Sequence, residues 1–553
     1  MLYFLYFIVF FLFLFFTGRG CLVLLNKIGV IKSFNDSQIV VNFKIYNLYP
    51  LIGLFFIGNL TVLLNFVIPI KNRLVILISL FLIFLNLLSK INLNLKIDQF
   101  LLFLLSGFIL SISSYSTGLS YDAGLYHLNY QRILQTEKIS FGLSNFHSRY
   151  GFSSIYDFIN TNFWLDNNLI LLHFTNLTFI ILFFQITYQI FTNSKSLNVK
   201  FSIIVIYLYG IFDNFGLNGG KNGFLEIEGI AKYDSPFAVL FFLTGLAIKN
   251  LIDSKKFNTV NLNFLIIISF FSFQLRPLGA LLIIFTMILI FSEKIQFKNY
   301  KHSFFIIFFT STFWFIKNII ISGCLVYPIN ISCIEKLNWF NSQIIETELK
   351  DISNSLVAYK PGDNIITWFN FWISDNEYNL STSVNFLIFF LTILIIRFIF
   401  FKSKNSIDSK YFLFLLVSFL IWITNAPDFR FLIGILILTV STLFLKNDLK
   451  AKKEYNFPKL LCFALLILCM LGLPRADNYY YFLNSFLEVP EKQIPKTSYI
   501  KNELTYGYTP AESRELCWVN IECTPSYSLP VDISYLNGYK FYQKATVISK
   551  NDT

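Results

Sequence analysis

The sequence predicts an all-α polytopic integral membrane protein. Of its 553 residues, 55% are hydrophobic, 19% are aromatic and 14% are charged, whereas soluble domains carry about 25% charged residues. Apolar runs close to the ~20 residues that cross a bilayer recur along the whole chain. The Lys and Arg residues behind the net charge of +12 lie in short clusters between these runs. The positive-inside rule places basic residues there, so we exclude nucleic-acid binding.

The apolar runs predict a bundle of roughly 12–14 transmembrane helices, since each run is near the length of one span. They lie at residues 2–17, 47–70, 74–89, 100–116, 167–192, 201–217, 236–249, 262–275, 278–292, 303–322, 385–401, 411–424, 429–445 and 459–475. The first run lacks the basic region and cleavage site of a signal peptide, so we interpret it as a span. Residues 262–292 form either one helix or two. Pro277 favours a hairpin, because it lacks an amide hydrogen and clashes with the preceding turn.

The basic residues also predict which side each loop occupies. With an outer N-terminus and a hairpin at Pro277, every strong basic cluster from Arg19 to Lys453 lies on the cytoplasmic side. The opposite face receives the loops 117–166 and 323–384, the Gly-rich segment 213–234 and the C-terminus. We therefore divide the chain into a multi-span domain, residues 1–475, and a small extracytoplasmic region, residues 476–553.

The seven cysteines fall into two groups. Three lie in or near apolar runs and are expected to be small buried side chains: Cys21, Cys462 and Cys469. The other four form two close pairs in polar segments, Cys324 with Cys333 and Cys517 with Cys523. Such pairs predict disulfides in an oxidising compartment. Zinc is the alternative, although the spacings are not C-x-x-C and no His stands nearby.

The stretch 121–157 is the first candidate site. It holds two of the chain's four histidines, yet it is rich in Tyr, Phe, Leu and Gly, unlike a flexible linker. Asp122 can accept a proton from a hydroxyl group or bind a metal ion. Its alternative role is to cap the helix that follows. An amphipathic helix over Ala123–Lys138 would put His127 on the same side as Asp122.

Further candidates for phosphate binding follow along the chain. Asn145, His147 and Arg149 alternate in a Gly-flanked turn, and Arg holds a phosphate with two parallel hydrogen bonds. Lys317 interrupts an apolar run near its outer end, either as a functional group or as a lysine that snorkels to the headgroups. The remaining candidates are Arg276 at the broken helix, and Asp428 and Arg430, which bind a ligand or pair with each other.

These motifs carry a resemblance to known proteins. The patterns D-x-x-L-Y-H-L (Asp122–Leu128), G-L-x-N-x-H-x-R-x-G-F (Gly142–Phe152), K-N-x-x-x-S-G-x-x-x-Y-P (Lys317–Pro328), A-P-D-x-R-F (Ala426–Phe431) and C-W…C-T-P (Cys517–Pro525) are similar to those of a family of largely uncharacterised bacterial membrane proteins. The acid just after a span, the many spans and the outer C-terminal portion resemble the GT-C class of membrane glycosyltransferases.

The GT-C resemblance implies a reaction on the extracytoplasmic face of the bacterial inner membrane. A sugar would pass from a polyprenyl-phosphate donor to a lipid or glycan acceptor. Asp122 would be the base or the ligand of a divalent metal such as Mg²⁺ or Mn²⁺, although Asp122-Ala-Gly is not a D-x-D motif. Arg149, Arg276 or Lys317 would meet the donor phosphate. The alternatives are a surface-polysaccharide polymerase or ligase with its essential residues in loop 323–384, a transporter or flippase of lipid-linked glycans, and an assembly protein without chemistry.

Overall fold

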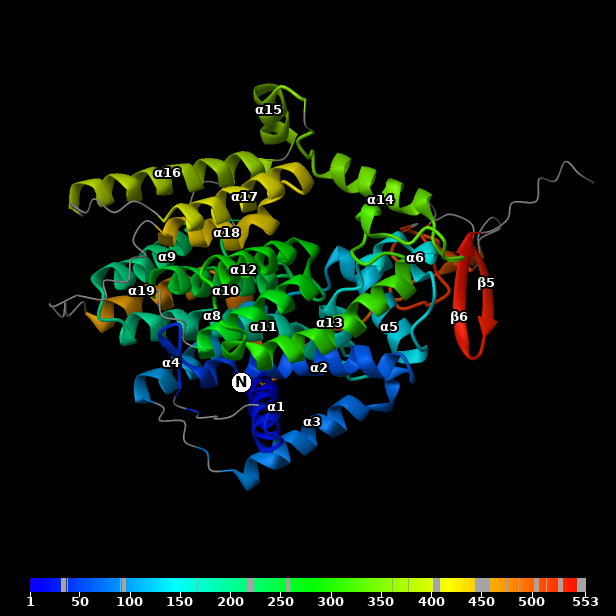
Figure 1. The fold of residues 1–553 in the computed structure, drawn as a ribbon, viewed down its shortest axis with the longest axis horizontal. Helices are drawn as coiled ribbons and strands as arrows, with labels where there is room; N and C mark the ends of the chain where they lie inside the picture. The colour runs from blue at the N-terminus through cyan, green and yellow to red at the C-terminus, as the bar shows by residue number, and fades with distance from the viewer. Residues whose placement is uncertain are drawn as a thin grey trace, which may run out of the picture.

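The computed structural model describes residues 1–30, 36, 38–89, 91, 96–166, 168–215, 223–254, 259–360, 362–375, 377–400, 408–442, 458–473, 476–485, 487–501, 507–513, 515–525 and 531–544. Helices dominate these residues (Figure 1). The only sheets in the described chain are three antiparallel pairs of short strands, β1–β2, β3–β4 and β5–β6. They span Ile39–Val40, Phe43–Lys44, Tyr499–Lys501, Tyr508–Pro510, Val531–Leu536 and Tyr539–Lys544. The predicted all-α class is confirmed at this level.

Each predicted apolar run falls on a helix. These helices are α1 (Leu2–Lys27), α2 (Tyr49–Asn65), α3 (Leu74–Leu85), α4 (Ile97–Ser114), α8 (Ile170–Asn193), α9 (Leu197–Phe215), α10 (Asp234–Ser254), α11 (Thr259–Leu275), α12 (Ala280–Ser292), α13 (Lys301–Ser322), α16 (Glu377–Phe400), α17 (Ser409–Asn425), α18 (Phe429–Thr442) and α19 (Lys459–Leu471). In the described chain, 7 helices are long and apolar enough to cross a membrane, and shorter apolar helices of 10–17 residues accompany them. The chain therefore has the helices of a membrane protein.

Burial separates a central helix from the surface helices. In α8, 94% of its most apolar window is buried, against 22% in α13. A helix that is apolar on all sides belongs in the interior of a bundle. The exposed side of α13 carries Phe304, Phe305, Phe308 and Phe309, an apolar surface that suits contact with lipid chains.

The break at Pro277 is confirmed. Helix α11 ends at Leu275, Arg276 is extended with φ −146° and ψ 142°, and α12 starts at Ala280 and packs beside α11. The return requires Gly279, because a Cβ there would lie 2.4 Å from the backbone nitrogen of Phe273. The chain thus reverses, and Arg276 is placed in an irregular turn at the ends of two helices.

The remaining α-helices lie between the apolar helices or after the last of them. They are α5 (Leu128–Thr136), α6 (Leu143–Phe146), α7 (Ile155–Asn160), α14 (Ser342–Ser355), α15 (Ile365–Asp375) and α20 (Ala476–Asn484). Figure 1 shows α5, α6, α14 and the β5–β6 hairpin gathered at one end of the molecule, with α15 beside α16 and α17. The hairpin is held to loop 117–166 by backbone hydrogen bonds that Phe141 exchanges with Lys540 and Tyr542, each 2.8 Å long.

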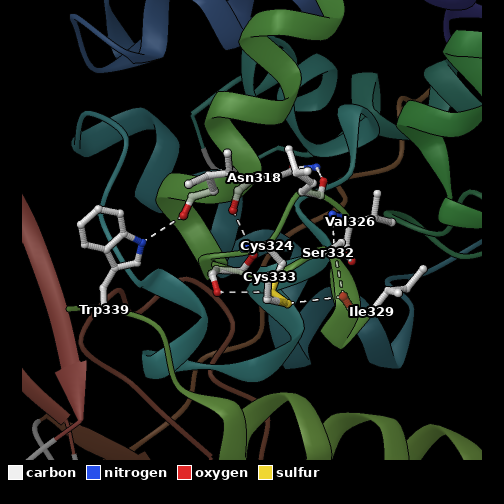
Figure 2. The surroundings of a disulfide bond; sticks show 10 residues. Asn318, Cys324, Val326, Ile329, Ser332, Cys333 and Trp339 are labelled. Carbon is white, nitrogen blue, oxygen red and sulfur yellow. Dashed lines mark hydrogen bonds between the residues drawn. A yellow bond between two sulfur atoms is a disulfide. The ribbon is translucent and has the colours of Figure 1, made fainter. Parts of the chain in front are cut away.

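Both predicted disulfides are present, Cys324–Cys333 and Cys517–Cys523. The first closes the turn directly after α13 (Figure 2), where Asn318 donates to the Leu325 carbonyl at 2.7 Å. The second holds Trp518, whose backbone amide donates to the Gly124 carbonyl at 2.8 Å. The C-terminal region therefore packs directly against the stretch that contains Asp122.

Candidate functional site

Asp122 begins an irregular turn. Residues Ala123–His127 form a π-helical turn that continues into α5, and such turns within α-helices occur frequently at functional sites. The cap of this turn is Ser120, whose hydroxyl accepts from the Ala123 amide at 3.0 Å. Asp122 makes no capping hydrogen bond with its side chain. The carboxylate is half-buried and is available for other partners.

His127 is paired with Asp157 and not with Asp122. Its Nδ1 lies 2.9 Å and 3.1 Å from the two carboxylate oxygens of Asp157, and both side chains are buried. Gln131 donates to the same carboxylate at 2.9 Å and accepts from the Trp164 indole at 2.9 Å. A carboxylate at one ring nitrogen fixes the tautomer of a histidine and leaves the other nitrogen for chemistry.

Two arginines from distant segments meet over one aromatic ring. The guanidinium carbons of Arg276 and Arg430 lie 4.3 Å and 5.4 Å from the centre of the Phe431 ring. Arg276 forms an ion pair with Asp234 at the start of α10. Arg430 pairs with Asp428 at 2.8 Å and keeps 29% of its side chain exposed. The structure thus joins the α11–α12 turn to the turn before α18.

Tyr126 and Tyr233 connect these arginines to Asp122. The Tyr126 ring lies 4.0 Å from the His127 ring, and the Tyr233 ring lies 5.5 Å from His127 and 5.0 Å from the Arg276 guanidinium. Burial raises the pKa of Tyr126 well above its usual value, and the nearby Tyr233 and Asp122 charges raise it further. Asp122 is therefore within electrostatic range of both tyrosines.

We call these five residues the arginine–tyrosine site: Asp122, Tyr126, Tyr233, Arg276 and Arg430. Burial lowers the pKa of Arg276, Tyr233 and Glu228 oppose this effect, and the Arg430 charge adds to it. The two guanidinium groups are close enough to repel each other. Asp234 and Asp428 each balance one of these charges, and an anionic ligand would bind at the guanidinium nitrogens that these carboxylates leave open.

Arg149 and His147 stabilise the neighbouring turn. The Arg149 guanidinium lies 3.1 Å from the buried Glu348 carboxylate of α14. His147 Nδ1 accepts from the Arg149 amide at 3.2 Å. Burial and the Arg149 charge lower the pKa of His147 to about 3, so this imidazole is neutral at physiological pH. Arg149 retains an electrostatic effect on the arginine–tyrosine site, since its charge lowers the pKa of Tyr126.

Asn145 and Lys317 are committed to the protein itself. The Asn145 amide donates to the backbone carbonyls of Trp339 and Tyr542, both at 2.8 Å. The Lys317 ammonium bonds to the carbonyl and hydroxyl of Ser153 at 2.6 Å and 3.0 Å. Lys317 is 0% exposed, so it does not snorkel to a surface. These two side chains hold loop 117–166 in position.

Asp157, Tyr126 and Tyr233 were not selected from the sequence. Of the three, Asp157 alone had a signal in the sequence that could have selected it. It is an acid at the end of the stretch 121–157, which contains two histidines. In the part of the chain that the structure describes, no group of three or more His, Cys, Asp or Glu is placed to hold a metal ion. Residues 216–222 of the Gly-rich segment lie outside the described residues.

Residues 1–437 match a family model described as a domain of unknown function (DUF8201). The chain belongs to this family. No curated protein and no solved structure matches the chain. The DUF8201 region contains the whole arginine–tyrosine site, from Asp122 to Arg430, whereas the Cys517–Cys523 loop and the β5–β6 hairpin that pack on it lie beyond residue 437.

Proposed function

We propose that this DUF8201 protein is a membrane glycosyltransferase that moves a sugar from a polyprenyl-phosphate donor to a lipid or glycan acceptor. The observation that carries the proposal is that the Asp122 charge acts on Arg430, whose guanidinium shares the Phe431 ring with Arg276. The Asp122 carboxylate accepts no hydrogen bond from any described residue. A base beside two cations is the arrangement that transfer from a phosphate leaving group requires.

The two arginines would bind the donor phosphate. A guanidinium matches two phosphate oxygens with parallel hydrogen bonds, and this geometry is lost with lysine. Arg430 is partly exposed and accessible, while Arg276 is anchored by Asp234 and Tyr233. Their positive charge would stabilise the phosphate as its bond to the sugar breaks.

Asp122 would be the general base. It takes the proton from an acceptor hydroxyl, whose oxygen forms the new bond to the anomeric carbon. The bond from that carbon to the phosphate oxygen breaks, and the polyprenyl phosphate leaves with its electron pair beside Arg276 and Arg430. A divalent metal such as Mg²⁺ would use Asp122 and phosphate oxygens, but the described residues supply no three-donor group around it.

The His127–Asp157 pair would hold Tyr126 in position for this reaction. Asp157 is a positioning residue, since it contacts His127 and Gln131. His127 contacts Tyr126 through its ring, so the orientation of the imidazole determines where the tyrosine stands. The basic clusters support a multi-pass arrangement in a bacterial inner membrane with the site and both termini on the extracytoplasmic side. Membrane lipids would surround the exposed apolar helices.

The test is transfer from radiolabelled polyprenyl-phosphate sugars by purified protein in lipid nanodiscs, with a membrane lipid and glycan extract as acceptor. Asp122→Asn keeps the size of the side chain and removes the base, so we expect a loss of about 100-fold or more. Asp532→Asn, an exposed acid on β5, is the matched control and should keep full activity. Equal rates for Asp122→Asn and wild type would exclude Asp122 as the base.

A polysaccharide polymerase or ligase is the second candidate. It is favoured by the contact between Arg149 and the buried Glu348 of loop 323–384, which gives that loop a charged residue beside the same region. Glu348→Gln would then abolish activity while Asp122→Asn retains it. The opposite pattern supports the transferase.

A further inference from the structure

A groove lies in loop 323–384. It encloses about 510 Å³ between the C-terminal end of α14 and the first turns of α15, and it is lined by Asn354, Lys360, Asp363, Trp368 and Phe371 among others. We propose that this α14–α15 groove binds sugar rings of the acceptor glycan. Its role with an acceptor rests on the proposed transferase function, whereas the binding of sugar is an independent property.

The floor of the groove is aromatic, and its indole nitrogen already has a hydrogen-bond partner in the protein. The Trp368 indole nitrogen donates to the Val357 carbonyl at 2.8 Å. Trp368 is 9% exposed and forms the base of the groove, so the ring that a ligand can reach is that of Phe371, which is 61% exposed. Trp368 stacks on Trp372 with ring centres 5.9 Å apart and 19° between the planes. The face of an aromatic ring carries partial negative charge and attracts the C–H groups on the apolar face of a sugar.

The rim of the groove supplies both hydrogen-bond donors and hydrogen-bond acceptors. Within the described chain, the side chains of Ser353, Asn354, Lys360 and Asp363 make no hydrogen bond to the protein. A hydroxyl, an amide, an ammonium and a carboxylate together offer both donors and acceptors. Sugar hydroxyls are donors and acceptors in turn, so an aromatic floor with such a rim fits a carbohydrate.

The same rim argues against a lipid chain as the occupant. Lys360 and Asp363 would lose hydration without gaining a partner if an isoprenoid filled the groove. The volume falls within the range of 300–1,000 Å³ that is typical of sites for small ligands, which combine an apolar lining with a few polar groups. The exposed apolar residues of α15 that do not line the groove, Ile365, Ile366 and Phe369, remain available for lipid.

The groove is tied to the arginine–tyrosine site through its floor. The Trp372 indole donates to the Pro427 carbonyl at 2.6 Å, and its ring lies 5.6 Å from Phe429. These residues flank Asp428, which forms the ion pair with Arg430. Helix α15 is thus docked on the turn that carries one of the two proposed phosphate ligands, which is where an acceptor-binding element belongs.

The experiment measures binding of trisaccharides of glucose, N-acetylglucosamine, galactose and rhamnose to the full chain in nanodiscs by isothermal titration calorimetry, without a donor. We expect at least one trisaccharide to bind saturably and Phe371→Ala to weaken it about tenfold, equivalent to about 1.4 kcal/mol. Phe371 is 61% exposed, so its replacement should leave folding intact. Phe369→Ala, on the same helix but outside the groove, is the matched control and should bind as wild type.

The outcomes separate this inference from the proposed transferase. Binding that survives Asp122→Asn and is weakened by Phe371→Ala supports the groove even if no transfer is detected. Failure of every trisaccharide to bind, or equal affinity in Phe371→Ala and Phe369→Ala, overturns the proposal that the groove binds sugar. Neither result affects the proposed role of Asp122 as the base. Displacement of a bound trisaccharide by farnesol, lost in Phe371→Ala, would show that the groove is a lipid site and also overturn it.

Discussion

Replacement of Asp157 by asparagine tests whether the His127 tautomer matters. In the wild type, the Asp157 carboxylate accepts from His127 Nδ1 at 2.9 Å and from Gln131 at 2.9 Å. Asparagine retains one oxygen for Gln131 and presents its NH₂ group to the imidazole. With the oxygen at the Oδ1 position, the NH₂ group takes the Oδ2 position, which lies 3.1 Å from Nδ1. Donation from this NH₂ group to Nδ1 moves the ring proton to Nε2, so the nitrogen that faces away from residue 157 changes from an acceptor to a donor.

The loss of stability in Asp157→Asn can be compared with its loss of activity. A hydrogen bond to a charged group contributes about 1.5–3 kcal/mol and a neutral one about 0.5–1.5 kcal/mol, so Asp157→Asn should lower the free energy of unfolding by about 1–2 kcal/mol. Gln131→Met removes one hydrogen bond to the Asp157 carboxylate and one neutral hydrogen bond from Trp164, for a loss of about 2–4.5 kcal/mol. This variant leaves the tautomer unchanged and is therefore the matched control.

Denaturant unfolding in detergent measures stability, and transfer activity measures function. If the tautomer positions the site, Asp157→Asn should lower kcat by about 100-fold or more, as for a lost general acid or base. Gln131→Met, with a stability loss at least as large, should retain most of its activity. Nitrogen NMR of labelled histidine should report the change of tautomer. A common fall in kcat for both variants would mean that activity merely follows stability, and the reasoning would be refuted.

Three further predictions follow from neighbouring groups. Arg276→Lys and Arg430→Lys should each raise the KM for the donor about tenfold with a smaller change in kcat, because lysine cannot hold a phosphate with two parallel bonds; unchanged KM values would remove the arginines from the donor site. Burial raises the pKa of Glu228 to about 7, above that of a solvated carboxyl, so the folded state holds this proton longer than the unfolded state. Stability should therefore fall as pH rises from about 4.5 to 7, by up to ~3 kcal/mol, and Glu228→Gln should flatten this part of the profile, as measured by denaturant unfolding across the range. Cys517→Ser should lower the unfolding free energy by about 2 kcal/mol and reduce transfer, since the Cys517–Cys523 loop holds Trp518 against Gly124; full activity after alkylation of the reduced protein would contradict this.

Much of the helical framework could be predicted because hydropathy is local. The reversal at Arg276 followed from a single proline, and the structure has the expected break between α11 and α12. The disulfides Cys324–Cys333 and Cys517–Cys523 followed from spacing in polar segments, and both are present. Each of these features is encoded within a few residues of where it appears.

The partners within the site depend on contacts that no local pattern encodes. His127 pairs with Asp157, 30 residues away, and its spacing from Asp122 gave no indication of this. Arg276 and Arg430 are joined by the Phe431 ring only after the bundle has packed. Lys317 occupies the same helical position whether it snorkels or bonds to Ser153, and only tertiary structure distinguishes the two.

The β5–β6 hairpin has a consequence for the order in which the protein matures. Phe141 exchanges backbone hydrogen bonds with Lys540 and Tyr542, and Asn145 donates to the Tyr542 carbonyl. Asn145 and Tyr542 are 397 residues apart, so these partners are synthesised long after the loop that they complete. Nascent chains must therefore carry an incomplete Asp122 loop until β6 has been synthesised. A chain that stops short of β6 would have its apolar helices but a loop without these hydrogen bonds, and that loop would be open to proteolysis.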